Sequence, residues 1–309
     1  MVRNILIAAA LVVIATGAFL MTVTNANAQG SSNNDKIIIS GASGQLGGLA
    51  VKQLLAKGVP AKNLVLVSRT PDSLQDYAKQ GAVVRYGDFE KPESLAAAYA
   101  GGTRLLLISV GLGKVPRPTL HGNAIDAAKK AGVKQIVYTS WVALSKDDKT
   151  GLGVDHSATE ELLKKSGVPY TFLRNSIYMD NALAAGTKMV ADGKVTAVPN
   201  EVKLGYITRE DCAAAAVAAL TTPGHDNKAY DITGPELVGT ADIAATASAV
   251  SGKKVDVVQP DPSAAAPRGF FGPSAAIVSD DFKKLTGRAP TSLKTFFEVN
   301  KSKLSGAKS

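Results

Sequence analysis

DKIIISGASGQLGG, residues Asp35–Gly48, joins a short β-branched run to three glycines spaced three residues apart. The run is typical of a buried strand, and an amphipathic helical pattern follows the glycines. In such a strand–turn–helix unit, Gly41 permits the tight turn, Gly44 lets the backbone approach a pyrophosphate, and Gly47 lets the helix pack closely on the strand. The free N–H groups at the start of the helix attract phosphate. We therefore expect this loop to bind a dinucleotide through Gly41, Ser43, Gly44, Gln45, Leu46 and Gly47.

Strand and helix patterns alternate through the next part of the chain. Six apolar runs predict strands, each separated from the next by a helical pattern: KIIIS, NLVLVS, AVVRYGD, RLLLISV, KQIVYTS and PYTFLRN. The runs are apolar throughout, as in parallel strands that helices cover on both faces. The predicted fold class is therefore α/β, with a Rossmann-like, doubly wound parallel sheet.

The regularity weakens after Asn175. We expect helices at MDNALAAGTKMVADG, before Leu220 and at TADIAATASAVSG, strands at KAYDITG and KVDVVQP, a loop from Pro260 to Ala276, and a helical closing segment. The predicted organisation is a NAD(P)-binding Rossmann domain at residues 36–175 and a smaller substrate-binding region at residues 176–309 that contributes to the same fold. In doubly wound folds such C-terminal material packs over the carboxyl ends of the strands, so it is expected to shape the substrate site.

The N-terminus has the three parts of an export signal. Arg3 precedes a long apolar run, Ile5–Met21, and a polar segment ends in Ala26-Asn27-Ala28. We expect residues 1–28 to be cleaved as a signal peptide and residues 29–35 to form a flexible leader. The run is long for a signal, so an uncleaved membrane anchor is the alternative. The protein is thus expected to be periplasmic, or anchored in the inner membrane and facing the periplasm, and to contact a membrane only in the second case.

Composition excludes several other classes. Of 309 residues, 45% are hydrophobic and 20% charged, which is typical of a globular protein. The charge of +9 comes from basic residues dispersed along the sequence without a nucleic-acid-binding motif, so no nucleic-acid partner is expected. The one cysteine, Cys212, lies in an Ala-rich helical pattern and is expected to be buried and inert. The three histidines lack metal-ligand spacing, so no metal is expected; the sequence does not indicate the oligomeric state.

The end of the second predicted strand indicates which nicotinamide cofactor is preferred. NAD-binding proteins place a carboxylate there, whereas this chain has Arg69 in VSRTPDSL. A guanidinium matches a 2′-phosphate, so NADP(H) is preferred and NAD(H) remains possible. The alternative is that Arg69 only caps the following helix. Four further residues are expected beside the cofactor: Asp88 and Phe89 near the adenine, and Ser109 and Val110 along its middle.

The helix after the fifth predicted strand lacks a familiar catalytic pair. Typical short-chain dehydrogenases carry Tyr-x-x-x-Lys there, and no tyrosine in this chain has a lysine four residues later. His156 and Glu160 occupy the expected place, one helical turn apart. We expect them to share a helix face and to pair, with the imidazole directed at substrate or nicotinamide. The alternative is a solvated ion pair.

Several ordered motifs resemble one known family. GASGQLG, LLLISV, AAKKAGVKQIVYTS, GLGVDHSATEELLKKSGVPYTFLRNSIYMDN and GYITREDCAAAAVAAL together are similar to the NmrA-like branch of atypical short-chain dehydrogenases, most of all to its bacterial type-2 NADPH:quinone oxidoreductases. The resemblance covers about Lys36 to Ser251. It implies substrate contacts from Asn175 and Tyr178, with Tyr138, Thr139 and Ser140 at the nicotinamide side.

Two functions are compatible with these patterns. The first is an NADPH-dependent oxidoreductase that transfers a hydride to a small quinone or related carbonyl compound. A quinone is already electrophilic, so its reduction depends more on orientation than on a strong acid. The alternative is a non-catalytic, NAD(P)-binding redox-sensing module, since NmrA-like proteins include regulators of this kind.

Overall fold

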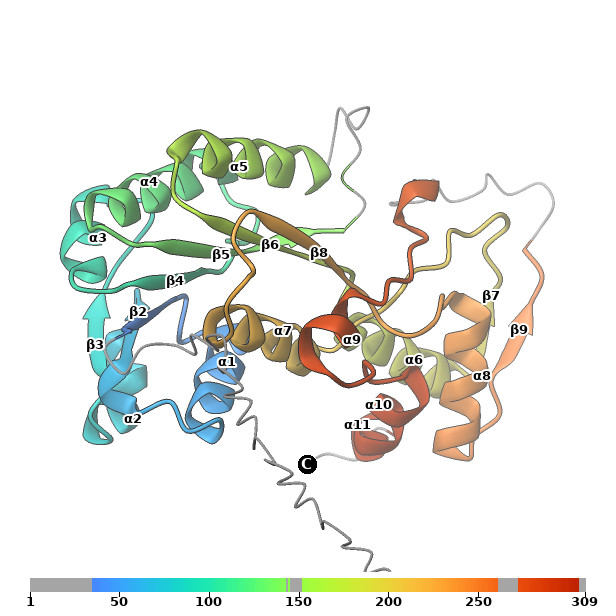
Figure 1. Ribbon diagram of the computed structural model, residues 1–309. Helices are drawn as coiled ribbons and strands as arrows, with labels where there is room; N and C mark the ends of the chain where they lie inside the picture. Colours follow the sequence, from blue (N-terminus) through green and yellow to red (C-terminus); the bar gives the residue numbers. More distant parts are fainter. Residues whose placement is uncertain (1–34, 143, 145–151, 261–271, 306–309) are drawn as a thin grey trace, which may run out of the picture.

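A parallel sheet forms the centre of the molecule (Figure 1). The computed structural model describes residues 35–142, 144, 152–260 and 272–305. The strands of this sheet are β1 (Ile37–Ser40), β2 (Leu64–Ser68), β3 (Val83–Tyr86), β4 (Arg104–Leu107), β5 (Gln135–Trp141), β6 (Tyr170–Asn175) and β8 (Lys228–Ile232). They lie in the order β3-β2-β1-β4-β5-β6-β8, all parallel. The predicted fold class is confirmed, and so are the six strands expected before Asn175.

Helices cover both faces of the sheet, because every strand is followed by a crossover. They are α1 (Gln45–Ala56), α2 (Gln75–Lys79), α3 (Pro92–Tyr99), α4 (Arg117–Lys130), α5 (Leu152–Ser166) and α7 (Arg209–Thr221). Alternate residues of β1 point to opposite faces. Ile37 and Ile39 therefore join the core beneath α1 and α7, whereas Ile38 joins the core beneath α3, α4 and α5.

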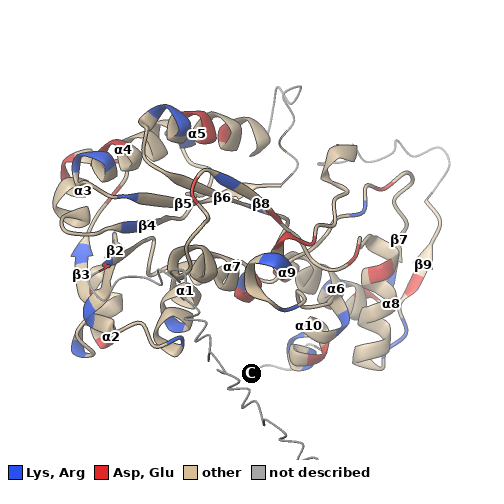
Figure 2. Cartoon of the chain, in the orientation of Figure 1, with Lys and Arg blue, Asp and Glu red and all other residues tan. Residues whose placement is uncertain are grey.

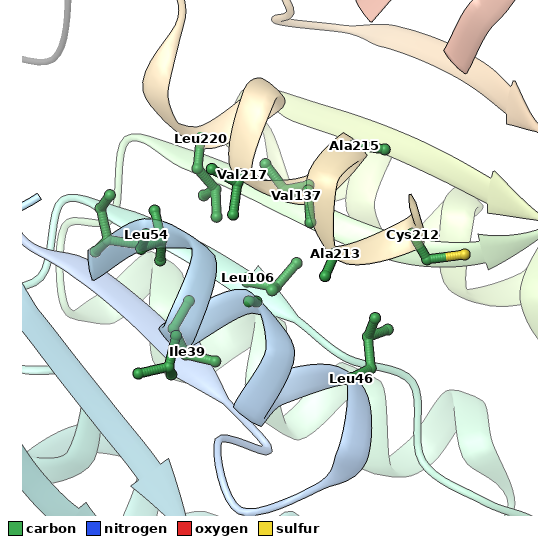
Figure 3. Packing of buried hydrophobic residues seen from close by; sticks show 14 of the residues in the cluster. Ile39, Leu46, Leu54, Leu106, Val137, Cys212, Ala213, Ala215, Val217 and Leu220 are labelled. Atoms are coloured by element: carbon green, nitrogen blue, oxygen red, sulfur yellow. The ribbon is translucent and has the colours of Figure 1, made fainter. Parts of the chain in front are cut away.

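The α1–α7 layer is packed closely because α7 is rich in alanine. Small side chains let the helix backbone approach the sheet and α1, and Val217 and Leu220 fill the space near Leu54 of α1 (Figure 3). Cys212 is fully buried in the same layer. Burial raises the pKa of its thiol well above the ordinary value, so the thiolate form is suppressed.

The order of the strands places a crevice at one edge of the sheet. β1 is followed in the chain by β2 on one side, whereas β4 lies on its other side. The connections after β1 and β4 therefore leave in opposite directions, and the space between them is where doubly wound proteins bind ligands. We call this side, where the parallel strands end, the carboxyl edge, and the opposite side, where they begin, the amino edge.

A second group of elements has its own core. It comprises α6 (Met179–Asp192), β7 (Lys194–Thr196), α8 (Thr240–Ser251), β9 (Asp256–Val258), α10 (Leu293–Val299) and α11 (Lys301–Leu304), while α9 (Asp281–Thr286) packs on α7. β7 was not predicted as a strand, because three residues are too few to show a period; it pairs with β9 in parallel. The closing segment was predicted as helical, and the structure breaks it into short helices at Gly287, whose φ is +78°.

Two predicted segments fall mainly outside the described residues. They are the N-terminal signal with its leader, and most of the expected loop from Pro260 to Ala276. Among the helices that the structure describes, none is long and apolar enough to span a membrane.

Candidate functional site

The glycine-rich loop has the geometry that its sequence predicted. Gly41 adopts φ +94°, a left-handed conformation that favours glycine. A Cβ on Gly47 would lie 2.2 Å from the Gly41 carbonyl oxygen, so only glycine allows this approach of helix and turn. Gly44 begins α1 without a side-chain cap. The N–H groups of the first turn are therefore free for phosphate oxygens, and the positive end of the helix dipole favours that charge.

A cleft of about 470 Å³ lies over this loop at the carboxyl edge. Most of the predicted cofactor residues line it: Gly41, Ser43, Gly44, Arg69, Asp88, Phe89, Ser109 and Val110. The structure thus brings together the ends of β1, β2, β3 and β4. Gln45 and Leu46 lie in the first turn of α1, outside the cleft lining, and the Leu46 side chain is buried in the core.

Hydroxyl groups surround Arg69 at the end of β2. Ser43 Oγ and Ser68 Oγ are 2.7 Å apart, and Thr70 N–H donates to Ser68 Oγ at 2.9 Å. The Arg69 side chain is exposed beside them. A guanidinium together with nearby hydroxyl donors can bind a phosphate monoester. Thr70 was missed by the sequence analysis, although its position directly after Arg69 was a usable signal.

Asp88 and Phe89 form the wall after β3. Asp88 Oδ1 accepts from the Glu90 N–H at 3.1 Å, which folds the chain back at this point. The Phe89 carbonyl accepts from the Asn123 amide at 2.9 Å, which ties the wall to α4. These bonds fix the wall on one side of the cleft.

The loop after β4 is held by two buried side chains. Thr139 Oγ1 accepts from the Ser109 N–H at 2.8 Å, and His121 Nε2 accepts from the Val110 N–H at 3.1 Å. Thr139 is therefore a support behind the cleft rather than part of its lining. His121 has the same role, and sequence analysis missed it because the contact joins residues on different elements.

Hydrogen bonds define the tautomer of His121 on α4 and connect it to His156 on α5. His121 Nε2 accepts, so Nδ1 carries the proton and donates to Thr159 Oγ1 at 2.9 Å. The Thr159 hydroxyl in turn donates to the Asp155 carbonyl. The Tyr138 hydroxyl lies 2.8 Å from His156 Nδ1 and also interacts with Thr159, so it links both histidine side chains to one buried network.

Both imidazoles are neutral at physiological pH. Burial lowers the pKa of His121 to about 4 and that of His156 to about 3, and the nearby Arg117 guanidinium lowers both further. Burial also raises the pKa of the Tyr138 phenol. His156 can therefore donate a hydrogen bond, but it is not a cationic acid.

The predicted pairing of His156 with Glu160 is wrong. Glu160 instead accepts two bonds from Arg174, at 2.9 and 2.8 Å, and one from Ser140 Oγ at 2.7 Å. Arg174 lies on β6, so the stronger bidentate partner comes from the sheet. Two other residues expected at the nicotinamide side are buried as well: Ser140 is held by Glu160, and Tyr138 faces α4 and α5.

Asn175 ends β6 at the carboxyl edge with its amide buried. Its side-chain oxygen and nitrogen have no hydrogen-bond partner among the described residues, although the residue is only 3% exposed. Burial raises the pKa of the Tyr178 phenol, and the Asn175 amide, which approaches the phenol without the geometry of a hydrogen bond, opposes part of that rise. The Tyr178 ring also packs against the Arg209 guanidinium at 4.4 Å. The structure therefore brings Asn175 and Tyr178 together, outside the residues that line the cleft, and their contact with substrate stays a prediction.

No metal centre is evident in the described part of the chain. No group of three or more His, Cys, Asp or Glu side chains there could hold an ion. The arrangement instead suits an organic ligand: a phosphate-binding helix start, a cleft across four strand ends, and a polar amide farther along the same edge.

Comparisons with known proteins agree with this geometry. A family model described as NAD(P)H-binding matches residues 41–223. Quinone oxidoreductase 2 of Escherichia coli (strain K12) is 38% identical over 220 residues, which are 71% of this chain and 76% of the relative. The NAD(P)H azoreductase of Xenophilus azovorans is 30% identical over 223 residues, 72% of this chain and 76% of the relative.

Solved structures of NADP(H)-binding reductases have the same fold as this chain. The NADPH-dependent quinone oxidoreductase of Escherichia coli, complexed with NADPH, matches with a TM-score of 0.75 and 31% identity, covering 85% of this chain and 99% of that one. The triphenylmethane reductase of Citrobacter sp., complexed with NADP(H), matches with a TM-score of 0.72 and 32% identity, covering 84% and 97%.

Proposed function

The chain belongs to the NAD(P)H-binding, NmrA-like family of oxidoreductases, and we propose that it transfers a hydride from NADPH to a quinone or a related carbonyl acceptor. The observation that carries the acceptor assignment is the buried Asn175 amide. It lies at the carboxyl edge without a partner among the described residues. A buried polar group left unpaired is costly, and a ligand carbonyl would satisfy it.

The residues of the cleft fit NADPH. The uncapped start of α1 binds the pyrophosphate, and Arg69 with Ser43 and Thr70 holds the 2′-phosphate. Phe89 borders the adenine, and Ser109 and Val110 line the middle of the cofactor. When bound, NADPH supplies the hydride.

The protein contributes orientation to the reaction. The Asn175 amide donates to a carbonyl oxygen of the acceptor and holds its ring against the nicotinamide, while Tyr178 borders the same place. Two electrons and one hydrogen pass to the quinone, which becomes a hydroquinone anion, and water supplies the remaining proton. Since that anion is stabilised by its aromatic ring, the step does not require a cationic acid, and the buried, neutral His156 does not supply one.

A cofactor and acceptor assay tests the proposal. Protein beginning at Gln29 is mixed with NADPH and 1,4-benzoquinone, and loss of the reduced nicotinamide absorbance is measured above the background without protein. We expect turnover with NADPH. Tight NADPH binding without turnover on a panel of quinones and carbonyl compounds would contradict the proposal and favour a redox-sensing module.

We also propose that the protein is exported to the periplasm after cleavage behind Ala28, with an anchored form as the alternative. Arg3, the run Ile5–Met21 and the small residues up to Ala28 support it. Cell fractionation with sequencing of the mature N-terminus tests this. A soluble cytoplasmic protein that still begins at Met1 would contradict it.

A further inference from the structure

Lysines that are dispersed in the sequence gather at the amino edge of the sheet. In a parallel sheet every helix-to-strand connection reaches this edge, so residues far apart in sequence meet there. Its exposed lysines, which we call the basic edge, are Lys36, Lys57, Lys62, Lys129, Lys130, Lys134, Lys165 and Lys228. Figure 2 shows Lys and Arg in the turns of α4 and α5 from which the chain enters β5 and β6.

The acidic residues of this edge leave a positive excess. Asp35 pairs with Arg104, Asp76 with Lys79, and Glu161 with Lys164. The remaining carboxylates there, Asp126 and Asp226, are fewer than the lysines of the basic edge. At the carboxyl edge, by contrast, Arg69, Asp88, Glu90 and Lys91 mix both signs, so the excess belongs to one side of the molecule.

Helix dipoles explain only part of this arrangement. Lysines in the last turn of a helix interact favourably with its negative end, which accounts for Lys129, Lys130 and Lys165. Lys134 and Lys228 instead lie at the starts of β5 and β8, and Lys62 lies just before β2. Lys134 and Lys228 lie in no described helix, and Lys62 lies in a 3-10 turn of only three residues, Ala61–Asn63, so α-helix dipoles do not account for these cations.

We propose that the basic edge docks on an anionic phospholipid surface. Charge complementarity supports this occupant, since basic residues brought near such a surface are attracted to its headgroups. In the anchored alternative, in which residues 1–28 remain attached, the entry of the chain into the fold supports it too. Asp35 and Lys36 start β1 at this same edge, and residues 22–34, which separate them from the apolar run Ile5–Met21, reach at most roughly 45 Å when extended.

Docking in this way has a consequence for the reductase. The carboxyl edge, with the cleft and Asn175, faces away from the lipid, so NADPH and a water-soluble acceptor reach the site without crossing the docked surface. The proposal is independent of the proposed function, because it concerns the opposite side of the sheet.

Vesicle sedimentation tests the proposal. Protein beginning at Gln29 retains every residue that the structure describes and lacks the apolar run, so insertion of that run cannot cause sedimentation. It is mixed at low salt with vesicles of phosphatidylcholine alone or of phosphatidylcholine and phosphatidylglycerol in equal parts. Two triple variants are compared: Lys62→Glu, Lys134→Glu, Lys228→Glu at the basic edge, and Lys253→Glu, Lys301→Glu, Lys303→Glu elsewhere on the exposed surface.

The two variants have the same net charge, so they separate position from total charge. We expect the original chain to sediment only with the phosphatidylglycerol vesicles, and less at high salt. The basic-edge variant should partition more than about tenfold more weakly, since each basic residue near an anionic surface contributes roughly fivefold. The control variant should lose much less, and NADPH binding should persist in both as a sign of folding.

Several results would overturn the proposal. They are absence of sedimentation with phosphatidylglycerol vesicles, equal loss in the two folded variants, and binding to a DNA duplex at the same salt without binding to the vesicles. The last would assign the basic edge to nucleic acid.

Discussion

In the proposed reaction, single residues at the carboxyl edge set the cofactor preference and orient the acceptor. The position of Arg69 in the cleft lining could be predicted from sequence because it follows directly after a strand of the sheet, and its contact with a 2′-phosphate stays a prediction. The state of the Asn175 side chain could not be predicted from the sequence, because only the structure shows that its amide is buried without a hydrogen-bond partner among the described residues. His156 was placed on the correct helix but given the wrong partner, because sequence spacing cannot show that Arg174 reaches Glu160 from β6.

Arg69→Asp should change cofactor preference. The carboxylate repels the 2′-phosphate and removes charge-assisted bonds, so the Kd for NADPH should rise roughly 10- to 100-fold. The Kd for NADH should change far less. Fluorescence titration of both cofactors measures this, with Lys62→Asp at the opposite edge as a control of equal charge change. Equal weakening of NADPH and NADH would show that Arg69 does not bind the 2′-phosphate.

Asn175→Ala should lower kcat/KM for the quinone strongly while changing the free energy of unfolding little. No hydrogen bond within the described protein is lost, so the free energy of unfolding should fall by less than about 1 kcal/mol. The value of kcat/KM for the quinone should fall roughly 10- to 100-fold, because the orienting donor is gone. Urea unfolding and steady-state kinetics on the same sample measure both. A large loss of stability with unchanged kcat/KM would assign Asn175 a structural role.

Whole elements hold these residues in place. The predicted strands and α1 followed from periodicity and from glycine spacing, and they are present at nearly the expected positions. β7 is too short for any periodicity, and its parallel pairing with β9 depends on contacts distant in sequence. Hydrogen bonds also join β5, α4 and α5 through the side chains of Tyr138, His121 and His156. These contacts link residues on three different elements, so no sequence pattern indicates them.

These buried histidines should make stability depend on pH. In the folded protein the pKa is about 4 for His121 and about 3 for His156, below the ordinary value near 6.5. Between these folded values and pH 6.5, the unfolded chain therefore binds more protons than the folded protein. The free energy of unfolding therefore has its full value above pH 6.5 and decreases as the pH falls below it, by up to about 1.4 kcal/mol per pH unit for each histidine. Urea unfolding at pH 7 and pH 5 should show the decrease, and His156→Gln should reduce the difference. An unchanged difference in this variant would contradict the buried neutral state of His156.

At the scale of the whole molecule, the two edges of one sheet differ in what they carry. The carboxyl edge carries the cofactor cleft and the Asn175 amide, and the amino edge carries the lysine excess. Sequence analysis treated the basic residues as dispersed, which is correct along the chain. The parallel topology gathers them, so this surface became visible only once every helix-to-strand connection was placed at one edge.

The most direct test of the account follows a single hydride transfer. Protein beginning at Gln29 is saturated with NADPH, mixed rapidly with 1,4-benzoquinone, and followed by the reduced nicotinamide absorbance. The same run is repeated with NADPH deuterated at either face of the nicotinamide C4. We predict rapid oxidation that is slowed by deuterium on one face only, since the protein holds the acceptor against that face. Oxidation no faster than in free solution, or equal slowing by deuterium on either face, would contradict hydride transfer in this site.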